Sequence, residues 1–110
     1  MKILHTSELR MLKNFLEGIH KKRYLSVDFI AKEDNLLRNR KCVPFDYGES
    51  RSKDRFHFLD LNSPDGKHNL SILPEQVKKV EILDESFDPA DYVKWEPNWI
   101  VKRDWGGVYS

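Results

Sequence analysis

A chain of 110 residues, of which 39% are hydrophobic and 34% charged, is long enough for one folded domain (residues 1–110) and too short for two. Its net charge of +1 lacks the strong basic excess that is usual in a nucleic-acid-binding domain. The apolar runs are too short to span a membrane, no signal peptide is expected, and the single cysteine excludes an internal disulfide. We therefore expect a cytoplasmic protein without a membrane partner.

Charge is unevenly divided along the chain. Residues 1–55 hold 13 basic and eight acidic side chains (+5), whereas residues 56–110 hold six and ten (−4). This polarity could orient a polyanion or a second copy of the chain.

The first predicted element is an amphipathic helix over about residues 7–21. Thr6 and Ser7 offer hydroxyl groups for the N-cap, and basic residues suit the C-terminal end of the helix dipole. Apolar residues recur at helical spacing and form one stripe, made of Leu9, Leu12, Phe15, Leu16 and Ile19.

Five strands are expected after the helix. Their approximate ranges are 24–30, 36–43, 55–61, 69–73 and 77–83. Pro44 should end the second strand or lie at its edge, the polar segment 46–53 should be an exposed loop, and Asn62–Gly66 is a clear turn. The sequence therefore predicts a mostly β, α+β fold with one N-terminal helix and a five-stranded antiparallel, barrel-like sheet over about residues 23–84.

The predicted core joins the helix face to alternate residues of these strands. Its strand members are expected to be Leu25, Val27, Phe29, Val43, Leu59, Leu70, Ile72, Val80 and Ile82.

Residues 85–110 form a C-terminal extension rich in aromatic side chains. It contains all three tryptophans of the protein, Trp95, Trp99 and Trp105. Rings of this size can each bury about 150–250 Å². We therefore expect the extension to dock, either on its own barrel or on a partner.

No catalytic or metal-binding pattern stands out. The four histidines lack zinc-site spacing, and no Gly-rich phosphate loop or nucleophile motif occurs. Cys42 lies in no reactive motif and fits a buried structural thiol better than a nucleophile. The sequence predicts a non-enzymatic protein without a cofactor or metal.

A cationic and aromatic series is the best functional feature. It comprises Arg38, Arg40, Lys41, Arg51, Lys53, Arg55, Phe56, His57 and Phe58. Arg38 and Arg40 alternate along a strand and so share a face. Arginine can form bidentate hydrogen bonds with phosphate or carboxylate, and aromatic rings can stack on bases. Arg38, Arg40, Arg55 and His57 are the predicted anion or nucleic-acid contacts, and the alternative is a solvated strand face with ordinary ion pairs.

The order of these features resembles the WYL domain of bacteria, an SH3- or Sm-like barrel that usually follows a DNA-binding helix-turn-helix. The resemblance rests on Lys22–Phe29, on Arg40-Lys41-Cys42-Val43-Pro44-Phe45 and on Leu70–Val80. It implies an SH3/Sm-like barrel and a ligand-binding role. Phe56-His57-Phe58 stands where the family has Trp-Tyr-Leu, and Ile72–Gln76 lacks the arginines that precede the family's closing strand.

Together these features predict a stand-alone, WYL-like module for ligand sensing or accessory regulation, with a nucleotide, a nucleic acid or another anion as its ligand. The alternative is a protein-interaction or self-assembly module, a homo-oligomer among them, that uses Trp95, Trp99 and Trp105.

Overall fold

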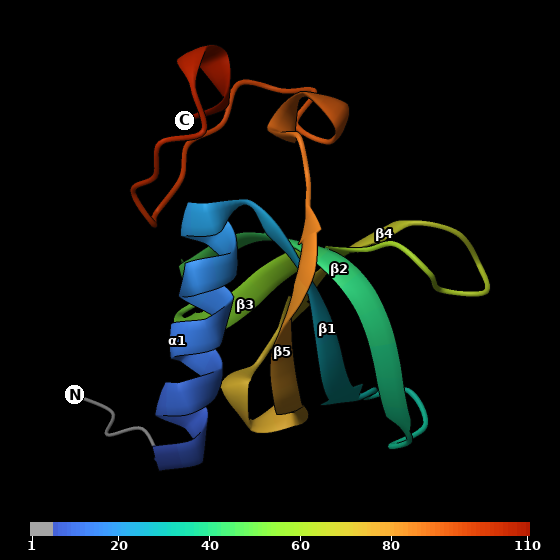
Figure 1. Ribbon diagram of the computed structural model, residues 1–110. Helices are drawn as coiled ribbons and strands as arrows, with labels where there is room; N and C mark the ends of the chain where they lie inside the picture. Colours follow the sequence, from blue (N-terminus) through green and yellow to red (C-terminus); the bar gives the residue numbers. More distant parts are fainter. Residues whose placement is uncertain (1–5) are drawn as a thin grey trace.

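The structure, a computed structural model, describes residues 6–110 (Figure 1). The predicted helix is confirmed as α1, Thr6–Lys21. Its buried positions are Met11, Phe15, Gly18 and Ile19, while Leu9 of the predicted stripe is 52% exposed. Thr6 and Ser7 both lie within the helix. The position that precedes the helix lies outside the described part of the chain.

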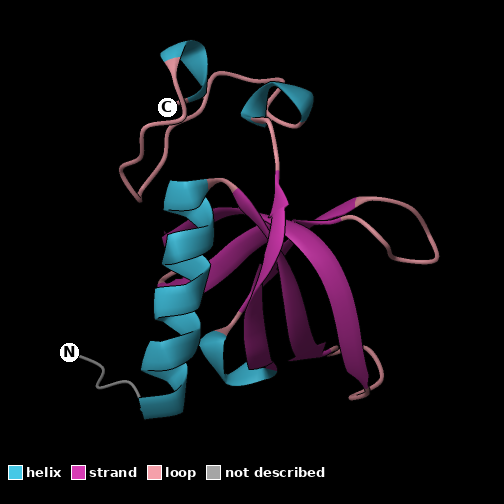
Figure 2. Cartoon of the chain, viewed as in Figure 1, coloured by secondary structure: helices cyan, strands magenta, loops and turns pink. Residues whose placement is uncertain are grey.

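The predicted five antiparallel strands are also confirmed. They are β1 Arg23–Ile30, β2 Leu37–Ser50, β3 Lys53–Asp60, β4 His68–Ile72 and β5 Val77–Ser86, in the sheet order β4-β3-β2-β1-β5. The sheet is not closed, because β4 and β5 lie at its two edges. A short 3-10 turn, Pro74–Gln76, joins the two edge strands. Figure 2 shows that the strands are strongly curved and that α1 lies along one side of the sheet.

The prediction that Pro44 ends the second strand, or lies at its edge, is wrong. β2 runs through Pro44 as far as Ser50, and Asp46 within the supposed exposed loop is buried. Proline is tolerated there because the β1–β2 ladder ends at the Leu25–Cys42 pair, and the β2–β3 register shifts between Pro44 and Asp46.

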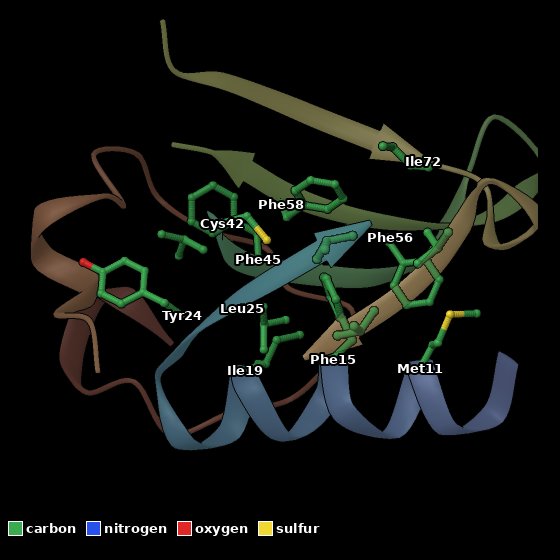
Figure 3. Close-up of a cluster of buried hydrophobic side chains, with 14 of the residues drawn as sticks. Met11, Phe15, Ile19, Tyr24, Leu25, Cys42, Phe45, Phe56, Phe58 and Ile72 are labelled. Atoms are coloured by element: carbon green, nitrogen blue, oxygen red, sulfur yellow. The ribbon is translucent and has the colours of Figure 1, made fainter. Parts of the chain in front are cut away.

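Most of the predicted core positions are buried, but the prediction chose the wrong face of β3. Phe56 and Phe58 point into the core, and Leu59 is only half-buried. The two rings therefore fill the interior and are not free to stack on bases. The Phe15 ring of α1 meets them edge-on, with its centroid 4.9 Å from that of Phe56 (Figure 3).

The chain after β5 has little regular structure. It contains two 3-10 turns, Pro89–Asp91 and Gly107–Tyr109. Figure 1 shows this segment at one end of the sheet, near the C-terminal end of α1. Within residues 6–110, no helix is both long and apolar enough to cross a membrane.

Candidate anion-binding site

A hollow of about 880 Å³ opens beside β4 and is lined by four arginines, Arg38, Arg40, Arg51 and Arg55. Its position follows from the strand register. Arg38 and Arg40 lie opposite Phe29 and Val27 of β1, which are 5% and 1% exposed, so the two arginines share the inner face of the sheet with core residues.

Arg38 is held by a carboxylate from the turn that precedes β2. Its Nη2 lies 2.5 Å from Oδ2 of Asp34. This contact lowers the pKa of Asp34 and raises that of Arg38. The Arg38 side chain is 24% exposed, so it still borders the hollow.

Arg40 is more deeply buried than Arg38 and is paired with a carboxylate. Its Nε lies 3.2 Å from Oδ2 of Asp60, and the side chains are 17% and 5% exposed. Asp60 also accepts a hydrogen bond from the main-chain nitrogen of Asn62 at 3.1 Å. Because Asp60 is nearly enclosed, Arg40 compensates a buried charge as well as lining the hollow.

Arg51 and Arg55 form no salt bridge with any residue in the range 6–110. The Nε group of Arg55 donates to the main-chain oxygen of Ser50 at 3.2 Å, which fixes the stem of the side chain. Arg51 and Ser52 form the two-residue β2–β3 hairpin, and their φ angles of 54° and 68° are those of a type I′ turn. Neither is the glycine or asparagine that would reveal such a turn in a sequence.

The remaining lining is mixed in character, and sequence reasoning did not find it. It comes from the ends of β1 and β4 and from the turns, and it includes Phe29, Lys32, Glu33, Pro64, Asp65, His68, Ser71, Ile72 and Gln76. Gln76 is fixed there because its Nε2 donates to the main-chain oxygen of Ile30 at 3.0 Å. These residues come from segments that are far apart in the sequence, and the fold brings them together.

His57 is the predicted contact that does not join the three arginines. It lines a second, smaller hollow of about 450 Å³, the aromatic groove, whose lining also includes Phe45, Trp95, Asn98, Trp99 and Ile100. The Nδ1 atom of His57 lies 2.7 Å from the hydroxyl oxygen of Ser71 on β4. Trp95 is 47% exposed at this groove, and its ring meets that of Phe45 edge-on at 5.5 Å.

The other two tryptophans contact the rest of the chain. Trp105 is 4% exposed, and its indole Nε1 donates to the main-chain oxygen of Ile19 at 2.7 Å. The guanidinium carbon of Arg103 lies 3.9 Å from the Trp99 ring centroid and 4.4 Å from that of Trp105. Asp46 lies 3.3 Å from Nη2 of Arg103. Burial lowers the pKa of Arg103 to about 10.

Other chemistry finds little support in the described residues. Cys42 is a free, fully buried thiol whose pKa is raised by burial. No group of three or more His, Cys, Asp or Glu side chains within residues 6–110 is placed to hold a metal ion. Comparison with known proteins finds no family model, no curated protein and no solved structure that matches the chain.

Proposed function

We propose that the protein is a non-enzymatic, WYL-like ligand-sensing or accessory regulatory module that binds an anionic ligand in the arginine-lined hollow. The observation that carries the proposal is the convergence of four arginines on one hollow, two of them without a carboxylate partner in the described chain. A volume of about 880 Å³ lies within the usual range of about 300–1,000 Å³ for small-molecule sites.

In this proposal the four arginines have different tasks. Arg51 and Arg55 supply the free positive charge that meets the ligand, and Arg38 adds a guanidinium already oriented by Asp34. Arg40 is mainly engaged with Asp60. The phosphate of a nucleotide or nucleic acid and the carboxylate of a metabolite would be recognised by the same groups.

The finer fold assignment is part of the same proposal. The strand order, the 3-10 turn between β4 and β5, and the pairing of β5 with β1 support an SH3/Sm-like arrangement that is open at one side. The free buried thiol of Cys42 supports a cytoplasmic location.

Titration with pyrophosphate and with citrate tests the binding function. Arg55→Gln should weaken binding about tenfold or more, because a hydrogen bond to a charged group is worth about 1.5–3 kcal/mol. Arg10→Gln on the exposed face of α1 is the matched control and should change nothing. If neither anion binds, or if both variants bind as the wild type does, the proposal is wrong.

A second candidate function is a protein-interaction or self-assembly module. The observation that favours it is the exposure of Trp95 (47%) and Ile100 (53%) beside the aromatic groove. Trp99 and Trp105 are engaged with Arg103, so Trp95 is the tryptophan of this module most accessible to a partner. Trp95→Ser should abolish concentration-dependent association, measured by sedimentation, if this function holds.

A further inference from the structure

We propose that β4 accepts an extended acidic peptide as a sixth strand, with carboxylate and apolar side chains alternating along it. The proposal rests on the proposed function, because it assigns the anion of the arginine-lined hollow to the side chains of a peptide.

The main-chain edge of β4 is open. β4 pairs with β3 on one side and has no strand on the other. No main-chain hydrogen bond outside the β3–β4 ladder reaches His68–Ile72 within the described residues. Figure 3 shows Ile72 on the part of the sheet away from α1. An edge of this kind offers unpaired N–H and C=O groups that only another extended chain can satisfy together.

The opposite edge of the sheet is different. α1 packs against β5, and Asn14 of the helix donates to the main-chain oxygen of Val80 at 3.0 Å. Exposed Lys78 and Lys79 add charge along that strand. β5 is therefore protected in the way that natural sheet edges usually are, and β4 is not.

The two hollows lie mainly on opposite faces of β4. Leu70 and Ile72 pair with the buried rings of Phe58 and Phe56, so they belong to the inner face of the sheet. Asn69 and Ser71 belong to the outer face. The arginine-lined hollow includes His68, Leu70 and Ile72 of the inner face and also Ser71, and the aromatic groove includes Asn69 and Ser71 of the outer face and also Leu70. Each hollow therefore lies mainly on one face of β4, and the two meet along this strand.

The side chains of a strand added to β4 would reach both hollows. Successive side chains of a strand point to opposite faces, so one set would reach the arginines and the other the groove beside Trp95. Charge complementarity selects carboxylates for the first set, because the hollow that they would enter is lined by Arg38 and Arg40 of the inner face. The same hollow is lined by Arg51 and Arg55, which have no carboxylate partner in the described chain. The phenyl and indole rings of Phe45 and Trp95 select apolar side chains for the second.

The probe is an acetylated and amidated seven-residue peptide in which Glu occupies positions 1, 3, 5 and 7, Val positions 2 and 6, and Tyr position 4. Five residues of β4 span about 17 Å, which such a peptide covers. The control peptide has the same composition with its four glutamates in one block. We expect the alternating peptide to bind at least tenfold more tightly, and Arg55→Gln to reduce that binding at least tenfold, with Arg10→Gln as the control.

Main-chain pairing has its own readout. Two further peptides carry main-chain N-methyl groups, one on the odd positions and the other on the even positions. Alternate N–H groups of a strand point to opposite edges, and only one edge of the added strand faces β4, so only one of the two methylated peptides should lose binding. Hydrogen exchange of the β4 amides should slow at least tenfold in the complex. Equal binding of the alternating and blocked peptides, equal effects of the two methylation patterns, or unchanged exchange would each overturn the added strand.

The two proposals can fail separately. If pyrophosphate binds in an Arg55-dependent way but the alternating peptide has no advantage over the blocked one, the peptide inference is wrong and the anion site stands. If pyrophosphate and both peptides fail to bind, both proposals are wrong. Self-association through β4 that the alternating peptide cannot displace would show that a second copy occupies this edge, and would also overturn the inference.

Discussion

The indole nitrogen of Trp105 donates a hydrogen bond of 2.7 Å to the main-chain oxygen of Ile19, although the two residues are 86 positions apart. Ile19 lies in the last turn of α1, where main-chain oxygens have no partner within the helix. Its other donor, the main-chain nitrogen of Lys22, is farther away, at 3.3 Å. Trp105 of the C-terminal extension thus supplies a hydrogen-bond donor to the last turn of α1.

Trp105→Phe should destabilise the protein by about 1 kcal/mol, because the ring remains while one buried hydrogen bond is lost. Trp105→Ala should cost about 3–5 kcal/mol through the cavity it leaves. Urea denaturation followed by circular dichroism measures both. Trp95→Phe is the matched control, and since Trp95 is 47% exposed it should cost less than 0.5 kcal/mol, about the size of ordinary surface changes. Equal losses of stability in Trp105→Phe and Trp95→Phe would contradict a stabilising role for the Trp105–Ile19 hydrogen bond.

Arg103 is the centre of the contacts that hold the extension. Its side chain has no exposed surface, and its partner is Asp46, which also accepts hydrogen bonds from the main-chain nitrogens of Ile100 and Val101. Arg103→Met should cost about 3–5 kcal/mol, because it leaves the carboxylate of Asp46 buried without its cation. The double variant Arg103→Met with Asp46→Asn should recover part of that loss in the same denaturation measurement. A double variant less stable than the sum of both single variants would contradict this pairing.

The helix and the order of the strands could be predicted because each has a clear local signal. Apolar spacing identifies α1, period-two alternation identifies β1, and Pro64 with Gly66 marks the turn before β4. The length of β2 could not be predicted, since Pro44 is a local signal for a strand end. The strand can continue through Pro44 because the ladder with β1 stops before it, and the point where that ladder stops is a property of the tertiary structure.

The face of β3 was ambiguous for a related reason. Arg55-Phe56-His57-Phe58-Leu59 contains apolar residues of both parities, so alternation alone allows Leu59 or the two phenylalanines to face inward. Packing decides in favour of the rings, because Phe15 and Phe29 approach them edge-on.

The candidate site was predictable only in part. The spacing of Arg38 and Arg40 placed both on one face, and the structure brings Arg55 to the same hollow. The carboxylates that engage two of them, Asp34 and Asp60, could not be assigned. Asp60 lies 20 residues from Arg40, and its approach depends on the pairing of β2 with β3.

Phe15→Ala should destabilise the protein by about 3–5 kcal/mol, the usual cost of removing a buried aromatic ring. Phe15 is 1% exposed and packs edge-on against Phe56 and Phe58. Thermal and urea denaturation measure the loss. Lys13→Ala, two positions away on the exposed face of α1, is the control and should be nearly neutral. A loss below about 1 kcal/mol for Phe15→Ala would show that the helix contributes little to the core.

Stability should decrease as the pH rises above about 9, and Cys42 should account for part of the decrease. Burial, with a contribution from Asp60, raises the pKa of the Cys42 thiol well above its ordinary value of 9.0. Above that value the unfolded chain releases the thiol proton while the folded protein keeps it, so the free energy of unfolding falls with pH. One such proton contributes a slope of about 1.4 kcal/mol per pH unit.

Cys42→Ala should lessen this slope between pH 9 and 10.5, although it lowers stability at every pH. Tyr24, whose pKa is raised by burial and by its hydrogen bond to Tyr92, leaves a residual dependence at higher pH. The slopes come from urea denaturation at a series of pH values. Identical slopes for the variant and the wild type, or rapid reaction of the folded protein with a thiol reagent at pH 8, would contradict the buried neutral thiol.

Arg38 and Arg40 should differ in their effect on stability, although the sequence presents them as equivalent. Arg40→Ala leaves the nearly enclosed carboxylate of Asp60 without its cation and should cost about 1–3 kcal/mol. Arg38→Ala removes a more exposed pair with Asp34 and should cost less than 1 kcal/mol. Urea denaturation distinguishes the two. Asp60→Asn should offset part of the Arg40→Ala loss, because the buried charge is then gone. Equal costs for Arg38→Ala and Arg40→Ala would mean that Asp60 obtains its compensation from another group, and Arg40 would then be as free for ligand binding as Arg55.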